Sequence, residues 1–125
     1  MIKLDPIIAV RNIQTSARWY RQVFGCRSTG IHLITLVAES GEVLLCLHPW
    51  GEHGHPTMHE PEIGAGHGLI LYFRTDNLDG IRKNVEMLNY AVEEEIHVNP
   101  NSRKKEFSLR DPDGYYLTIT EFHTY

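Results

Sequence analysis

Apolar and polar positions along the chain follow two periods, one of two residues and one of 3.6 residues, which distinguish strands from helices. By this criterion the first half of the chain contains a strand, a helix and two further strands: residues 4–10, 13–24, 32–39 and 42–48. Asn12 is a suitable N-cap for the helix, and Gly25 is suited to end it. Ser40 and Gly41 supply a turn between the two later strands.

The order of elements starts again in the second half. Here the pattern predicts a strand, a helix and three strands: residues 68–75, 78–88, 91–96, 106–110 and 115–122. Asn77 corresponds to Asn12, and Gly114 in the turn DPDG corresponds to Gly41. We therefore predict the order βαβββ twice, as an internal repeat. Coincidence is the alternative, because the two copies share a pattern and not identical residues.

The two faces of the predicted strands differ in character. One face is apolar throughout and is expected to pack against the two helices. The other face carries apolar side chains interspersed with polar ones: Ile7, Leu45, Leu47 and Ile70 with Asp5, Tyr72, Tyr116, Thr118 and Thr120. This mixture is typical of a ligand-binding cup, and the alternative is a sheet face exposed to water.

These patterns predict an α+β fold in which two βαβββ modules form a curved mixed sheet, a cup, with the helices on its outer face. A chain of 125 residues suits a single domain. We expect module one at about residues 1–49, a linker at about 50–66 and module two at about 67–125.

Composition narrows the possible partners. A formal net charge of -4 argues against general nucleic-acid binding and mildly favours a cationic ligand, although solubility explains it equally well. Cys26 and Cys46 set no disulfide framework and are expected in the core, in a reducing compartment. No apolar run approaches the length of a membrane span and no secretory signal opens the chain, so we expect a cytoplasmic protein without a membrane partner.

A histidine-rich stretch, HPWGEHGHPTMHE at residues 48–60, holds four of the eight histidines. A metal would need three or four of them, with His67, to converge in tetrahedral geometry. No cysteine joins them and no HExxH pair is present, so surface histidines are the main interpretation and a pH-sensitive lid the lesser one. Trp50 is expected either to stack on a planar ligand or to plug the junction of the modules.

Charged residues of the second half suggest ordinary surface roles. Glutamates at residues 93–95 precede the basic residues 103–105, and we expect the two groups to face each other across a hairpin. Arg110 precedes the DPDG turn, where an ion pair with Asp111 or Asp113 is its expected role. Glu121 is expected at a solvent-facing strand end.

Two stretches resemble segments of the vicinal-oxygen-chelate superfamily, which includes glyoxalase I, bleomycin-resistance proteins, fosfomycin-resistance proteins and extradiol dioxygenases. VRNIQTSARWYRQVFGC, residues 10–26, is similar to the first strand exit and helix of that superfamily. KEFSLRDPDGYYLTITEF, residues 105–122, is similar to its closing hairpin, closest to the version in bleomycin-resistance proteins. The repeated element order extends the resemblance over nearly the whole chain, and it implies a homodimer.

The resemblance also implies where a metal would bind. Metal-using members carry ligands at four strand positions, which fall here on Asp5, Leu45, Ile70 and Thr118. Leu45 and Ile70 have no donor atom, and Thr118 is a poor ligand for zinc or nickel. We therefore expect no metal and no other cofactor, and a ligand-binding surface made of the following residues: Asp5, Leu45, Trp50, Ile70, Tyr72, Tyr116 and Thr118.

The expected function is binding of a small, largely apolar or aromatic molecule in the sheet-lined cup. The alternative is a glyoxalase-like lyase or isomerase whose zinc or nickel is held by a non-standard set of ligands. The chain is expected to be catalytic only in the second case, and no catalytic residue is singled out.

Overall fold

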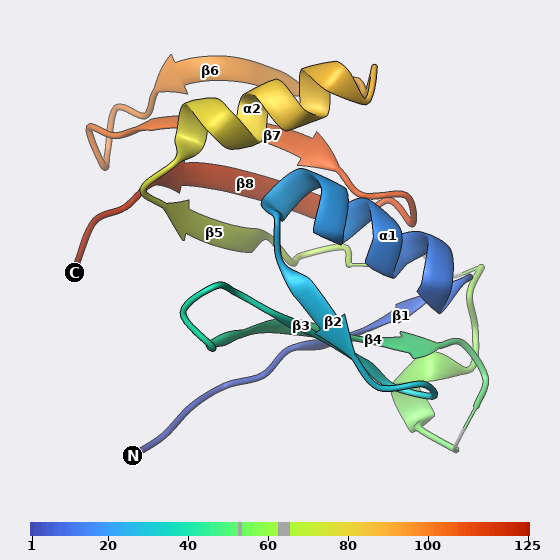
Figure 1. Ribbon diagram of the computed structural model, residues 1–125. Coiled ribbons are helices and arrows are strands. Elements are labelled where there is room, and N and C mark those ends of the chain that lie inside the picture. Colours follow the sequence, from blue (N-terminus) through green and yellow to red (C-terminus); the bar gives the residue numbers. More distant parts are fainter. Residues whose placement is uncertain (53, 63–65) are drawn as a thin grey trace. The chain divides into compact units, whose positions relative to one another are not determined.

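The structure, a computed structural model, describes residues 1–52, 54–62 and 66–125 (Figure 1). The chain forms two compact units, Met1–Ala65 and Gly66–Tyr125. Each unit contains one α-helix and a four-stranded mixed sheet. The predicted α+β class and the repeated βαβββ order are therefore confirmed.

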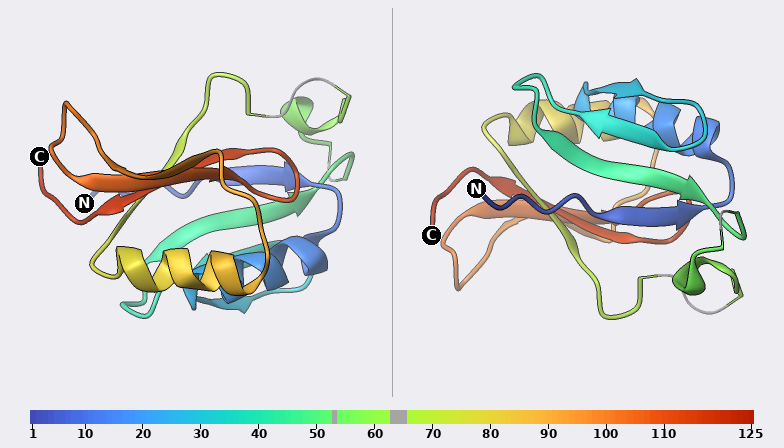
Figure 2. Two further views of the ribbon diagram at one scale, coloured as in Figure 1. Left: turned by 90° about the horizontal axis from the view of Figure 1, so that it is seen from above. Right: turned by 90° about the horizontal axis from the view of Figure 1, so that it is seen from below.

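The first unit has the strand order β1-β4-β3-β2. Strand β1 (Ile7–Val10) runs parallel to β4 (Val43–Pro49), as Figure 2 shows, and β4 pairs antiparallel with β3 (Ile34–Val37). Strand β2 (Arg27–Thr29) completes the sheet. The predicted βαβββ order implies a third strand in this module, but no residues were assigned to it, because three residues of mainly polar character are too short to show a hydrophobic period.

Helix α1 (Ile13–Phe24) begins and ends where its capping residues predict. The Asn12 side chain accepts a hydrogen bond from the backbone N–H of Thr15 at 2.9 Å. Gly25 has a left-handed conformation with φ 68°, and its N–H donates to the Arg21 carbonyl at 2.9 Å. The helix packs against β3 and β4.

The second unit has the strand order β5-β8-β7-β6. Its strands are β5 (Leu71–Thr75), β6 (Glu94–Val98), β7 (Lys105–Arg110) and β8 (Tyr116–Glu121). Strand β8 is parallel to β5 and antiparallel to β7, and β7 is antiparallel to β6. The DPDG turn between β7 and β8 is closed by Asp111, whose carboxylate accepts the backbone N–H groups of Asp113 and Tyr115, each at 2.9 Å.

Helix α2 (Leu78–Met87) covers one face of the second sheet. Its Arg82 guanidinium lies 5.9 Å from the ring centre of Phe107 in β7, which identifies the face that carries Phe107 as the helix side. Asn77 precedes the helix as predicted but makes no side-chain capping bond. The side chains of β7 and β8 on the helix side are fully buried: Phe107, Leu109, Leu117 and Ile119.

A β-bulge interrupts the pairing of β3 with β4. Val37 pairs with Val43, but the next residue back, Leu36, pairs with Leu45, so Leu44 is an extra residue in β4. Because side chains alternate along a strand, one extra residue moves every later side chain to the other face.

The bulge corrects the predicted faces of the first sheet. Ile7 pairs with Cys46, whereas Ile8 pairs with Leu47. Leu45 and Leu47 therefore share a face with Ile8, and the prediction that grouped them with Ile7 was wrong. All of these leucine side chains are buried, as expected for the side covered by α1.

No helix within the described residues is both long and apolar enough to cross a membrane. A short 3-10 helix, η1 (Pro56–Met58), lies in the segment after β4 and was not predicted. Both cysteines are free and buried, as expected. Burial raises the pKa of the Cys26 thiol, which contacts the Tyr20 carbonyl at 3.6 Å.

Candidate functional site

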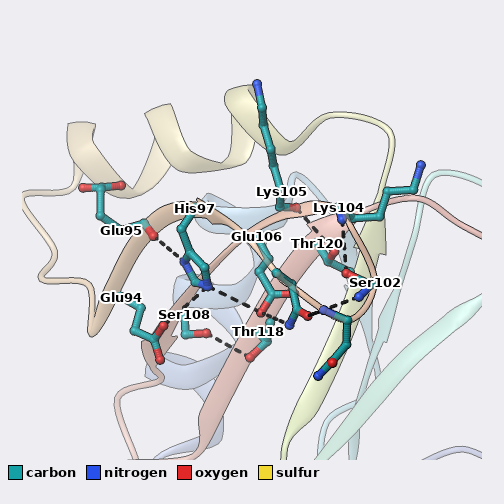
Figure 3. Close-up of polar contacts among 12 residues, drawn as sticks. Glu94, Glu95, His97, Ser102, Lys104, Lys105, Glu106, Ser108, Thr118 and Thr120 are labelled. Atoms are coloured by element: carbon teal, nitrogen blue, oxygen red, sulfur yellow. Dashed lines mark hydrogen bonds and ion pairs between the residues drawn. The ribbon is translucent and has the colours of Figure 1, made fainter.

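The face of the second sheet opposite α2 carries two adjacent rows of cross-strand neighbours that are rich in polar side chains. The rows are Tyr72–Thr118–Ser108–Glu94 and Arg74–Thr120–Glu106–His97. We call this surface, together with Tyr116 and Arg110 in the next row, the polar face. Figure 3 shows that its residues from β6, β7 and β8 point toward one another.

Two hydroxyl groups form the centre of the polar face. Ser108 and Thr118 are both buried, and their side-chain oxygens are 2.9 Å apart (Figure 3). Thr120, in the next row, donates a hydrogen bond to the Lys105 carbonyl at 3.4 Å. The predicted site residue Thr118 therefore lies on the polar face, with its hydroxyl engaged by Ser108.

Glu106 is the most unusual group on this face, because its side chain is only 9% exposed. Its Oε2 accepts a hydrogen bond from the Asn99 side chain at 3.2 Å and lies 4.0 Å from His97 Nε2. Its Oε1 is buried and has no hydrogen-bond partner among the described residues. A buried carboxylate oxygen without a partner is costly, so it indicates a functional reason for its place.

Glu94 brings a second carboxylate to the polar face. Its Oε1 accepts a hydrogen bond from the Tyr116 hydroxyl at 3.4 Å, and its Oε2 lies 3.6 Å from His97 Nε2. The other ring nitrogen of His97 is 2.9 Å from the Glu95 carbonyl oxygen. His97 therefore stands between two carboxylates (Figure 3).

Exposed apolar side chains lie along β5, at one edge of the second sheet. Ile70, directly before β5, is 59% exposed, and Tyr72 is 41% exposed. Tyr116 is half-buried, and the Arg110 guanidinium lies 5.2 Å from its ring centre. The predicted residues Tyr72, Tyr116 and Thr118 thus belong to one sheet face and Ile70 directly precedes β5, while Glu94, Glu106 and His97 were missed. Alternation with Ser108 along β7 was the signal that would have placed Glu106 there.

The other predicted site residues belong to the first unit. Asp5 is exposed before β1, and Trp50 is half-buried after β4. Leu45 has 0% exposure and lies on the face that α1 covers. As the structure stands, Leu45 offers no surface to a ligand.

Among the described histidines of the histidine-rich stretch, one is buried. His48 belongs to β4, is buried, and has its Nδ1 2.7 Å from the Pro49 carbonyl oxygen. Its ring centre lies 4.8 Å from that of His55, which is exposed. His48 is therefore not the surface histidine that we predicted. His53 lies outside the described residues, and the pH-sensitive lid stays a prediction.

The charged residues of the second unit pair differently from the prediction. Arg110 forms an ion pair with Glu93 at 3.2 Å and donates to the Gly114 carbonyl at 2.9 Å, so the expected pair with Asp111 or Asp113 was wrong. Glu95 pairs with Arg82 of α2 and not with the basic residues 103–105. Glu121 accepts the backbone N–H of Lys105 at 2.6 Å.

The Arg82–Glu95 pair makes stability depend on pH. Both carboxylate oxygens of Glu95 accept hydrogen bonds from Arg82 at 2.7 Å, which lowers the pKa of Glu95 to about 2. A lowered folded-state pKa stabilises the protein above the ordinary value of 4.5, and this stabilisation is lost as the pH falls toward 2. Urea unfolding of wild type and Glu95→Gln measures this contribution as the difference between their free energies of unfolding. We expect that difference to be constant near neutral pH and to shrink as the pH falls from 4.5 toward 2.

Glu39→Gln, which removes an exposed carboxylate of the first unit, is the control for this experiment. A stability difference between wild type and Glu95→Gln that stays constant down to pH 2 would contradict the prediction.

Comparison with known proteins gives the family. Residues 3–119 match the family model described as Glyoxalase/Bleomycin resistance protein/Dioxygenase superfamily. The match covers nearly the whole chain, so the chain belongs to this superfamily. Among proteins with curated descriptions, none matches the sequence significantly.

Several solved structures share the fold. A protein from the mobile metagenome of V. Pseudocholerae has a TM-score of 0.75 and 23% identity, with 99% of this chain and 97% of that chain covered. A lactoylglutathione lyase from Agrobacterium tumefaciens has a TM-score of 0.73 and 21% identity, with 96% and 92% covered. A bleomycin resistance determinant encoded on transposon Tn5 has a TM-score of 0.71 and 14% identity, with 99% and 100% covered. These similarities establish the fold and not the activity.

The residues at the metal positions that the resemblance implies do not fit a metal ion. Ile70 provides no donor atom, and Thr118 already bonds Ser108. Leu45 has no donor atom either and lies on the α1 side because of the bulge, whereas Cys46, on the opposite face of β4, has its thiol 3.6 Å from the Thr35 hydroxyl. Across residues 1–52, 54–62 and 66–125, no three His, Cys, Asp or Glu side chains are grouped so that they would hold one. The usual metal-dependent chemistry of the superfamily therefore has no matching ligand set in this part of the chain.

Proposed function

We propose that the protein binds a small, largely apolar or aromatic molecule on the polar face of the second unit, without the superfamily's usual metal. The observation that carries this proposal is the combination of exposed apolar side chains at the β5 edge with a buried carboxylate oxygen on the polar face that has no hydrogen-bond partner among the described residues. Ile70 and Tyr72 are exposed where most large apolar side chains of the second sheet are buried, and Glu106 has a carboxylate oxygen without a partner.

The chemistry of the face suits an aromatic ligand. Tyr72 and Tyr116 provide ring surfaces for stacking and hydroxyl groups for hydrogen bonds. The Ser108 and Thr118 hydroxyls each have further hydrogen-bonding capacity beyond their mutual contact. Ligand sites are commonly apolar surfaces with a few polar anchors of this kind.

Sequestration of an aromatic drug is one form of this proposal, supported by the shared fold of the Tn5 bleomycin resistance determinant. The superfamily resemblance also supports a homodimer. For a homodimer, we expect sedimentation of the purified protein to give twice the mass of one chain.

The binding experiment uses bleomycin, indole and 2-naphthol as probes, with amide NMR spectra and thermal shifts as readouts. We expect at least one aromatic probe to perturb the amide signals of β5, β7 and β8. Tyr72→Ala should weaken that binding about tenfold, because a stacked aromatic contact and its buried area are lost.

Two matched variants make the result specific. Ile70→Ala should weaken binding, whereas Ile31→Ala removes an exposed isoleucine from the first unit and should not. Unchanged affinity in Tyr72→Ala and Ile70→Ala would contradict the proposed surface. Stoichiometric zinc or nickel in protein purified without chelator would contradict the metal-free form of the proposal.

A further inference from the structure

We infer that the ligand of the polar face carries a protonated nitrogen, which binds at the carboxylates of Glu106 and Glu94. This inference rests on the proposed function and specifies the chemical class of the ligand as a cationic aromatic molecule. The inference follows from two observations: the hydrogen bonds that the Glu94 and Glu106 carboxylates make, and the missing hydrogen bond at Glu106 Oε1.

Glu106 can accept a further hydrogen bond, and no donor among the described residues supplies it. A carboxylate accepts about four hydrogen bonds, and Glu106 receives one from Asn99 while its Oε1 receives none. Charged groups that are almost fully buried are normally paired. A ligand N–H group directed at Oε1 would supply the missing partner.

The electrostatics of this part of the face also favour a cation. The ion pairs that the structure records for Glu94 and Glu106 are both with His97, at 3.6 and 4.0 Å. A single imidazole carries at most one positive charge, so His97 does not balance two carboxylates. The His97 side chain is 38% exposed, so this end of the polar face is open to solvent.

The arginines nearby are engaged elsewhere, and within the described residues Lys104 and Lys105 form no ion pair with Glu94 or Glu106. Arg110 pairs with Glu93 and stacks on Tyr116, and Arg82 pairs with Glu95. Arg74, at the far end of the row that contains Glu106, lies 5.1 Å from the ring centres of Phe122 and Tyr125. Within the described residues, the two carboxylates at the β6–β7 side of the polar face therefore share one histidine as their ion-pair partner.

The register sets the spacing between the two parts of the ligand. Tyr72 in β5 and Glu94 in β6 belong to the same cross-strand row, with β8 and β7 between them. Neighbouring strands are about 4.8 Å apart, so the aromatic edge lies roughly 10 Å from β7 and roughly 14 Å from β6. The ligand should therefore be an elongated molecule with its ring system at one end and its amine at the other.

The test compares 2-(2-naphthyl)ethylamine with 2-(2-naphthyl)ethanol, which have the same ring system and differ in the charged nitrogen. Calorimetry and amide NMR at pH 7.5 measure affinity and location. We expect the wild-type protein to bind the amine at least about tenfold more tightly than the alcohol, because charge-assisted hydrogen bonds are the stronger class. Glu106→Gln and Glu94→Gln should each reduce this preference to about threefold or less.

Glu86→Gln, on the exposed side of α2, is the matched control and should keep the full preference. Glu94 is exposed, so Glu94→Gln keeps the test decisive if Glu106→Gln does not fold by circular dichroism. Equal binding of amine and alcohol by the wild type, or a preference that survives both glutamine variants, overturns the inference and leaves the proposed function standing. Absence of binding by either probe and by bleomycin, indole and 2-naphthol overturns the proposed function as well.

Discussion

Leu45→Ala is expected to lower the free energy of unfolding by about 2–5 kcal/mol, the range for removing a buried leucine side chain. Leu45 is fully buried and pairs with Leu36, which is also fully buried, on the side of the first sheet that α1 covers. The shortened side chain would leave a cavity in this core. Urea unfolding followed by tryptophan fluorescence measures the loss.

Leu44→Ala is the matched control for this prediction. Leu44 is the extra residue of the bulge and is only half-buried, so its truncation should cost about 1 kcal/mol. Equal losses in the two variants would contradict the bulge and would restore the original assignment of Leu45 to the ligand face.

Gly30→Ala is expected to destabilise the first unit by about 3 kcal/mol or more. Gly30 has φ 101°, a conformation that side chains disfavour, and an added Cβ would lie 2.1 Å from the Leu33 backbone carbonyl oxygen. The backbone between β2 and β3 would have to move to relieve the overlap. Thermal and urea unfolding of the variant measure the effect.

Gly41→Ala separates backbone strain from steric overlap. Gly41 also has a positive φ, of 90°, but nothing lies within 4 Å of an added Cβ. We expect a loss of about 1 kcal/mol, from strain alone. If Gly30→Ala and Gly41→Ala lower the free energy of unfolding equally, the predicted steric overlap between residue 30 and the Leu33 carbonyl is contradicted.

The candidate site places the binding chemistry in the second sheet. Its centre is a pair of buried hydroxyls, its β6–β7 side carries two carboxylates and its β5 edge carries exposed apolar groups. None of these groups forms the metal site that the superfamily resemblance implies. The ligand affinities of the variants at Tyr72, Glu94 and Glu106 will therefore show whether this member binds its ligand through aromatic contacts and charge.

Part of this site was predictable because its strand pairing is regular. Gly114 and the DPDG turn set the start of β8, and β7 and β8 pair from Arg110–Tyr116 to Glu106–Thr120 without interruption. Simple alternation from Tyr116 therefore placed Thr118 correctly on the same face. The same counting from Gly41 failed for Leu45, because the bulge at Leu44 adds one residue.

The sequence by itself determined the class of fold, the repeated element order, the caps of α1 and the superfamily, because helix periodicity, capping and turn signals are local properties of the chain. The tertiary structure decided which face Leu45 occupies, which arginine pairs with Glu95, and that Glu106 is buried with one oxygen unpartnered. These features depend on which strand or helix lies beside each residue. A bulge or an ion pair between elements leaves no periodic mark in either segment, so only the assembled sheet reveals it.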